Sequence, residues 1–297
     1  QLVKELEPGL NALFGLEYKQ YENQHSEIYT SESSDRAFEE EVMLSGFANA
    51  QVKGEGSGVS FDEAQETFSA RYTHETVALA FAITEEAIED NLYDRIASRY
   101  TKALARSMSN TKQVKAVEPL INGLPTTDGF DSGDGVSLFS TAHPTIAGTY
   151  KNTLSAQADL NETSLEQSLI DIAAMTDERG LRIAARGVKM IIPSKLQFTA
   201  ERLMKSQGRT ATADNDINAI ASMGMIPQGY RVNNYLTDDD AFYIITDVPN
   251  GMKMFNRAPL TTAMEGDFDT GNVRYKARER YSFGVSDPRG IFGVEGA

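Results

Sequence analysis

The sequence predicts an α+β protein organised around one long helix, one long strand and a projecting polar hairpin. Three patterns carry this prediction. Apolar residues recur every four positions after residue 85, which is a helical period. Residues 273–284 alternate between apolar and charged side chains, and residues 35–75 contain two alternating segments around a glycine-rich tip. Both of these periods are those of strands.

The overall composition excludes several classes of protein. The chain has 297 residues, a formal net charge of -15, no cysteine and three histidines. Disulfides and thiolate chemistry are therefore excluded. An acidic surface of this kind also disfavours binding to the phosphates of nucleic acid. No run approaches the roughly 20 apolar residues of a membrane span, so we expect no membrane partner.

Residues 1–34 are expected to form an N-terminal arm. Pro8 and Gly9 are predicted to break its opening segment. Residues 17–34 are rich in polar side chains, and we expect them to extend over the surface of this subunit or of a neighbour. Since an initiator methionine is removed only before small residues, Gln1 suggests a processed product or the ordered part of a longer chain.

Residues 35–75 are predicted to form a long hairpin. Val42 and Leu44 on one side, and Phe68, Ala70 and Tyr72 on the other, have the period of strands. Three glycines, at positions 54, 56 and 58, give the tip little rigidity. A two-stranded arm is marginal alone in water. Two interpretations stay open: a flexible surface loop, or an arm that becomes ordered against neighbouring copies.

The segment 76–118 is predicted to run from a strand into a long helix. Thr76–Ile83 has the composition of a buried strand, and Thr84 is a suitable helix cap. The apolar stripe then predicts a helix from Glu85 to about Val117, ended by Pro119, with a length of roughly 50 Å. Its stripe consists of Ile88, Leu92, Ile96, Tyr100, Leu104 and Met108.

Residues 119–255 are predicted to form a mixed domain of interspersed strands and helices. A helix is expected from Asn161 or Thr163 to about Asp177, and a buried strand over 188–192. Ser194 is expected to cap a further helix, and residues 230–235 and 241–246 are expected to form a hairpin.

The last segment, 256–297, contains the long amphipathic strand. Arg274, Lys276, Arg278 and Arg280 form its basic face. Because the chain is acidic overall, we expect these cations to pair with carboxylates of the same or a neighbouring subunit rather than with phosphate.

The candidates for chemistry are few. Residues 54–58 lack the lysine of a phosphate-binding loop, so no nucleotide or other cofactor is expected. Asp238–Asp240 and the loop with Asp128, Asp131 and Asp134 have carboxylates for a hard cation, but solvated turns explain them better. His143 is more readily a hydrogen-bonded turn residue than a general base, since we find no acidic partner at a telling spacing.

The order of these elements resembles the Hong Kong 97 fold of tailed-bacteriophage major capsid proteins, and within it the Mu-like major head subunit group. No single motif is diagnostic, but nearly the whole chain is covered. The segments that carry the resemblance are Thr76–Tyr93, Leu138–Pro144, Leu154–Leu169, Val188–Ser194, Phe198–Met204, Asn234–Tyr243 and Arg280–Ile291.

The resemblance implies a division into an N-terminal arm, an extended loop (35–75), a peripheral domain with a spine helix (76–118), an axial domain (119–255) and returning peripheral strands (256–297). It implies no enzymatic activity. Subunits would assemble as hexamers and pentamers into an icosahedral virion shell around double-stranded DNA, without reading its sequence, in the cytoplasm of a bacterial host.

Portal and scaffolding proteins, and in some members a decoration protein, are the implied partners. A scaffolding segment is often removed from the N-terminus, and otherwise a separate protein scaffolds the shell. Some members crosslink a lysine of this loop to a neighbour's asparagine, but the sequence identifies no partner for Lys53. Our candidates for subunit contacts are Lys53, Gly54, Glu55, Gly56, Gly58, Arg274, Arg278 and Arg280.

Two alternatives remain at this stage. The first keeps the fold and makes the shell an encapsulin-like compartment for protein cargo. The second is a cytosolic hydrolase that uses His143 and the Asp128–Asp134 loop.

Overall fold

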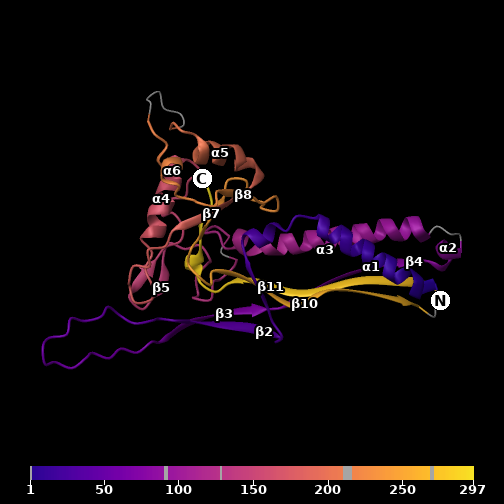
Figure 1. Ribbon diagram of the computed structural model, residues 1–297, viewed down its shortest axis with the longest axis horizontal. Coiled ribbons are helices and arrows are strands. Elements are labelled where there is room, and N and C mark those ends of the chain that lie inside the picture. The colour runs from indigo at the N-terminus through magenta and orange to yellow at the C-terminus, as the bar shows by residue number, and fades with distance from the viewer. Residues whose placement is uncertain (1, 90–92, 128, 210–215, 268–270) are drawn as a thin grey trace.

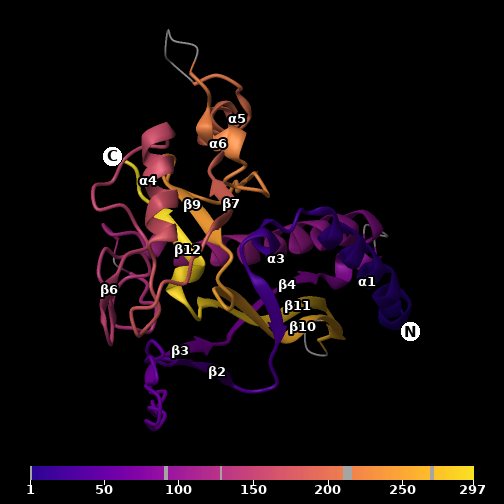
Figure 2. The same cartoon turned by 60° about the vertical axis from the view of Figure 1, so that its left-hand side comes forward.

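A computed structural model describes residues 2–89, 93–127, 129–209, 216–267 and 271–297. The chain forms a long unit of sheet and helices, a compact unit at one end of it, and a projecting extended loop, residues 35–75 (Figure 1). In both views the helices of the long unit cover one face of its sheet, and the extended loop leaves from the opposite side (Figure 2). None of the described helices has the length and apolar character needed to cross a membrane.

The long unit is built on a four-stranded sheet of order β1-β10-β11-β4. Alternate residues of β11 are buried, among them Tyr275 and Ala277, which pack with Leu104 and Met108 of the helix α3 (Tyr93–Asn122). The predicted amphipathic strand is thus confirmed. The four strands of this sheet are β1 (Thr30–Ser33), β4 (Glu75–Ile83), β10 (Met252–Gly266) and β11 (Val273–Val285).

Strand β4 does not have the predicted burial. It lies at the edge of the sheet, and most of its side chains are exposed, including Leu79. The prediction was wrong because an apolar run of this length cannot distinguish a central strand from an edge strand. The edge position leaves its outer backbone groups unpaired within the described part of the chain.

The predicted break at Pro8 and Gly9 is also wrong. Helix α1 (Leu2–Gln20) continues through both residues. Leu10 and Phe14 are buried against α3 and β11, and Asn11 accepts hydrogen bonds from Thr262 (2.7 Å) and Tyr275 (2.8 Å). These contacts offset the backbone hydrogen bond that a proline removes from a helix.

The chain after α1 covers its own subunit. A short 3-10 helix, Gln24–Glu27, leads to Tyr29, whose hydroxyl donates to the carbonyl of Ala116 at 2.6 Å. Strand β1 then pairs with β10 in parallel. Residues 17–34 were predicted to extend over their own subunit or over a neighbour. The described contacts show that this part of the arm lies on its own subunit.

The predicted long helix is described as α2 (Glu85–Glu89) and α3 (Tyr93–Asn122), with residues 90–92 outside the described ranges. Leu104 and Met108 are buried as predicted, whereas Tyr100 is about half exposed. Helix α3 passes Pro119, the predicted end. Leu120 in its last turn and Leu124 just after it are buried in the core between the two units and hold this end of the helix in place. The side chains of Ile88 and Leu92 lie outside the described set.

The predicted hairpin of the extended loop is confirmed. Strands β2 (Phe38–Leu44) and β3 (Glu66–Thr73) pair in antiparallel fashion, and Phe38 lies opposite Thr73. Residues 45–65, which we call the loop tip, join them without a helix or strand.

The compact unit contains a second sheet of order β12-β9-β7-β8. The predicted strand over 188–192 is its central β7, and the predicted helix cap at Asn161 is present. The predicted hairpin of 230–246 is wrong, since β8 and β9 each pair with β7 and lie on either side of it. The strands are β7 (Gly187–Ile192), β8 (Tyr230–Val232), β9 (Phe242–Thr246) and β12 (Ile291–Val294).

Short elements surround this second sheet. Helix α4 ends at Ala173, earlier than predicted. The helices are α4 (Glu162–Ala173), α5 (Gln197–Lys205) and α6 (Ala219–Met223), the small hairpin is β5 (His143–Thr145) with β6 (Gly148–Tyr150), and 3-10 turns cover Ser194–Leu196 and Pro288–Gly290.

Candidate assembly surfaces

The loop tip exposes large apolar side chains. Phe47, Val52, Val59 and Phe61 are 59%, 99%, 70% and 97% exposed, so their own subunit covers them little. Single exposed apolar residues are common, but four within one projecting segment make it a candidate contact surface. The glycines of this segment were predicted to matter from the sequence, but these four residues were not.

The predicted contact residues Lys53, Gly54, Glu55, Gly56 and Gly58 all lie in the loop tip and are exposed. Both the backbone N–H and the hydroxyl of Ser57 donate to the carbonyl of Gly54, at 3.2 and 2.7 Å. Gly56 has φ +80°, a left-handed conformation that other residues rarely adopt. The tip is therefore a defined turn in this structure and not a featureless linker.

In contrast, the root of the loop, by which we mean β2, β3 and the residues that join them to the sheet, is bonded to the long unit. Lys253 of β10 is buried and contacts Glu41 of β2 at 2.5 Å and Glu32 of β1 at 3.1 Å. Burial acts to lower the pKa of Lys253, but the hydrogen bonds to the two carboxylates outweigh it and raise the pKa overall. The hydroxyls of Tyr72 and Ser286 also share a hydrogen bond of 2.5 Å. These contacts connect both strands of the hairpin to the sheet.

A second tether joins the loop tip to the compact unit. Arg179 donates to the carboxylate of Asp62 at 3.3 Å and to the carbonyl of Glu63 at 2.7 Å. Asp62 in turn accepts the backbone N–H of Ala48 at 2.7 Å, and this bond is the main cause of its lowered pKa. One side of the tip is thus held close to the subunit, while its apolar residues stay uncovered.

The basic face of β11 is on the loop side of the sheet. A side chain at Gly284 would meet the ring of Tyr72, so the even-numbered positions face the extended loop. Arg274 pairs with Asp267 at 2.5 Å, as predicted. Among the described residues, Lys276, Arg278 and Arg280 have no carboxylate partner, and the half-buried Arg280 has an Nε without a hydrogen bond. The expected pairing within the subunit thus occurs at one of the four positions.

On the β4 side, small side chains flank these cations. The register places Ala82, Ala80 and Ala78 of β4 opposite Arg274, Lys276 and Arg278. Side chains of this size do not cover the basic residues, so a partner has access to them. We call Arg274, Lys276, Arg278 and Arg280 the sheet-face row.

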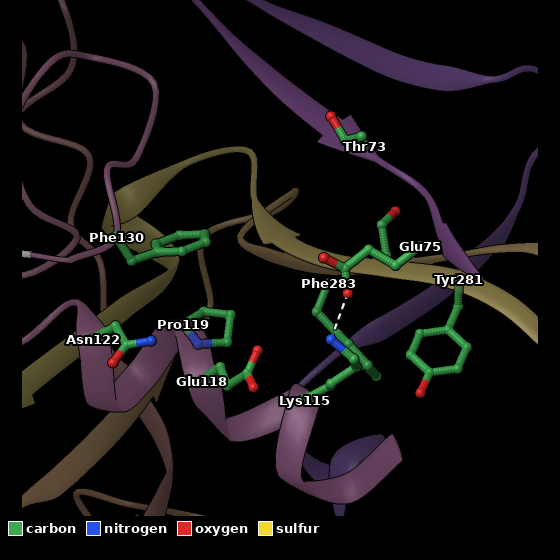
Figure 3. A pocket seen from close by; sticks show the side chains of 10 residues that line it. Thr73, Glu75, Lys115, Glu118, Pro119, Asn122, Phe130, Tyr281 and Phe283 are labelled. Atoms are coloured by element: carbon green, nitrogen blue, oxygen red, sulfur yellow. Dashed lines mark hydrogen bonds and ion pairs between the residues drawn. The ribbon is translucent and has the colours of Figure 1, made fainter. Parts of the chain in front are cut away.

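A small pocket lies between the root of the loop and the end of α3 (Figure 3). Its volume is about 170 Å³, and Glu75 pairs with Lys115 across it at 2.5 Å. Phe130 and Phe283 provide apolar walls. The described residues contain no group of three or more histidine and acidic side chains that could hold a metal ion.

His143 has the structural role that the sequence favoured. Its Nδ1 lies 2.6 Å from Asp134 and its Nε2 lies 2.9 Å from Asn152, and the ring is fully buried. Asp134 was not predicted as its partner, although it is only nine positions away, because spacing does not reveal how a loop folds back. Both ring nitrogens are occupied, which gives no support to the hydrolase hypothesis. Asp128 lies outside the described residues.

The acidic turn 238–240 behaves as a turn. A carboxylate oxygen of Asp238 accepts the N–H groups of Asp240 and Ala241 at 3.0 and 3.3 Å. Lys195 lies near the carboxylates of Asp239 and Asp240. These contacts explain the three acids without a cation.

A further exposed apolar group lies on the compact unit and was also missed. Phe198, Ile217 and Met223 are exposed on or beside α5 and α6, which pack against each other. Phe198 is out of phase with the buried Ala200 and Leu203 of the same helix, and this phase is the signal that could have identified it.

Comparison with known proteins agrees with this architecture. The chain is similar to a virus-like particle protein from Pyrococcus furiosus, at 10% identity and TM-score 0.56, over 97% of this chain and 98% of that chain. It is similar to the capsid of Myoviridae phage XM1, at 12% identity and TM-score 0.56, over 91% and 89%. A structure from Mycobacterium phage Ogopogo matches at 13% identity and TM-score 0.53, over 93% and 92%.

These similarities confirm the predicted Hong Kong 97 fold. No curated protein matches the chain. The family model described as phage capsid protein matches residues 67–294, which is most of the sequence and extends from β3 to β12. The Mu-like grouping stays a prediction. The chain therefore belongs to the phage capsid protein family, as a major capsid protein with a structural role.

Proposed function

We propose that this major capsid protein assembles as hexamers and pentamers into an icosahedral shell around double-stranded DNA, and that it has no enzymatic activity. Assembly would take place in the cytoplasm of the host, with portal and scaffolding proteins as partners. The extended loop acts as the clamp between subunits. Its glycine-containing tip would accommodate the different tilts of hexamers and pentamers.

The exposed apolar side chains of the loop tip are the observation that carries this proposal. Val52 and Phe61 are almost fully exposed in the single subunit. Burial of a side chain of this size contributes about 1.5–3 kcal/mol. A neighbour that covers the tip would therefore gain several kcal/mol from these residues, which offsets the ordering of the loop.

Charge supports the sheet-face row as the surface that receives a neighbour's loop. From residue 38 to residue 66, the loop has seven acidic residues and a single basic one, Lys53. The sheet-face row provides cations on the same side of the sheet from which the loop projects. Complementary potentials of this kind fix the partner and its register.

Deletion of Lys53–Val59 tests the proposal. The variant should fold, since the deleted residues make no contact with the core, but it should fail to form stable shells. Circular dichroism monitors folding and electron microscopy monitors particles. Normal particles from this variant would contradict the proposal. Particles of the intact protein that contain protein cargo and no nucleic acid would instead support the compartment alternative.

A further inference from the structure

A second group of cations without carboxylate partners lies on the opposite side of the long unit. Arg99, Lys102 and Arg106 of α3 are all exposed, and their spacing of three and four residues places them on one face of the helix. None of them forms an ion pair within the described residues. We call these three residues the helix row.

The helix row points away from the sheet. The buried residues of the same helix, among them Leu104 and Met108, pack against β11 and α1. The exposed neighbours on the row's own face, Ala103 and Asn110, are uncharged. No carboxylate of the described residues therefore pairs with the row, and its positive charge stays available to a partner.

Such a row is unexpected in this protein. The chain has 43 acidic and 28 basic residues, so carboxylates are abundant. Like charges three and four positions apart on a helix repel each other and weaken it. A row that remains unpaired under these conditions fits an anion supplied from outside the subunit.

We infer that the helix row binds the phosphate backbone of the enclosed nucleic acid without reading its sequence. The inference rests on the proposed function. The seven helical steps from Arg99 to Arg106 rise roughly 10 Å, over which one DNA strand presents about three phosphates. The extended loop and the sheet-face row share the other face of the sheet. If neighbours' loops occupy that face, the helix face is the one left for the contents of the shell.

The salt dependence of DNA binding tests this inference. The probe is a fluorescein-labelled duplex of about 20 base pairs, mixed with the unassembled full-length protein over a range of salt concentrations. The Arg99→Gln/Lys102→Gln/Arg106→Gln variant should bind more weakly, and its slope of log affinity against log salt should be shallower by roughly 2–3, since each phosphate contact contributes about 0.9.

Two matched variants serve as controls. Lys195→Gln/Lys205→Gln removes two exposed cations of the compact unit that already pair with carboxylates, Asp240 and Glu201, and should leave the slope unchanged. Arg99→Lys/Arg106→Lys keeps the charge of the helix row and should bind like the unchanged protein. Circular dichroism establishes that each variant is folded.

The possible failures can be told apart. Equal slopes for the unchanged protein and the glutamine variant, or no DNA binding by the unchanged protein at low salt, would overturn the inference. If the glutamine variant loses shell formation with an unchanged slope, the row binds protein and the inference is again wrong. A failure of the unchanged protein to form shells, with the expected slopes, would overturn the proposed function and leave phosphate binding in place.

Discussion

The root and the tip of the extended loop are parts of one hairpin, but their side chains are satisfied in different ways. At the root, Tyr72 is buried against Phe255, and Lys253 is enclosed by two carboxylates. At the tip, Val52 and Phe61 are almost fully exposed. The root is completed by its own subunit, whereas that subunit leaves these two side chains of the tip uncovered.

This difference separates the free energy of folding of one subunit from the free energy of its assembly with other copies. Contacts at the root contribute to the stability of a single chain, so a change there should be visible before assembly. We propose that the exposed apolar side chains of the tip contribute only when another copy covers them. Substitutions at the two ends of the same hairpin should therefore affect different measurements.

The largest expected effect is that of Tyr72→Ala at the root. Removal of a buried aromatic side chain costs about 3–5 kcal/mol of unfolding free energy, because it leaves a cavity beside Phe255. Urea unfolding of the unassembled protein measures this loss. The matched tip variant, Phe61→Ala, should change the unfolding free energy by less than about 0.5 kcal/mol. Similar losses in the two variants would show that the tip, too, is stabilised within the subunit.

The next effect concerns assembly and should show the opposite pattern. Val52→Ser/Phe61→Ser removes apolar area that we expect a neighbour to bury, at about 1.5–3 kcal/mol for each side chain. The protein concentration at which shells form, measured by light scattering, should therefore rise at least about tenfold. Ser57→Ala in the same turn is the control and should assemble at nearly the original concentration. An unchanged threshold for the double variant would mean that the tip is not a contact.

A smaller effect is expected at the sheet-face row. Lys276→Glu/Arg278→Glu should weaken assembly and reverse its response to salt, because added salt would then screen repulsion of the acidic loop. Exposed ion pairs contribute about 0.2–1 kcal/mol each, so the shift should be modest. The measurement is the assembly threshold at low and high ionic strength. The threshold of the unchanged protein should rise with salt, and that of the variant should fall. If both rise, attraction between the loop and this row is not part of assembly.

Sequence patterns predicted the elements whose periodicity is decided locally. The alternation in 273–284 and the strands around the glycines of the loop were found because each pattern reports its own geometry. The order of elements then allowed the fold to be recognised. Pro8 and the edge strand β4 were misjudged, since tertiary packing outweighs a local proline signal and burial depends on neighbours far away in sequence.

The candidate site was only partly predictable for a related reason. The glycine tip and the basic strand are visible in the sequence, but exposure of Phe47 or Phe61 is a property of the folded chain. The partners of His143 were hidden because Asp134 and Asn152 approach it through loop folding.

The smallest expected effect is a pH response of the root. Burial lowers the pKa of His74, helped by Arg280 and Arg257 and opposed by Glu39. The unfolded chain therefore binds a proton at a higher pH than the folded chain, so stability falls as the pH drops below the ordinary value of about 6.5. His25, with a pKa lowered to about 4 mainly by burial, acts in the same direction. His74→Gln removes the titrating group at the root. Between pH 7 and about 5, the unfolding free energy of this variant should vary less than that of the unchanged protein. If the two pH profiles run parallel, His74 does not couple protonation to the root of the loop.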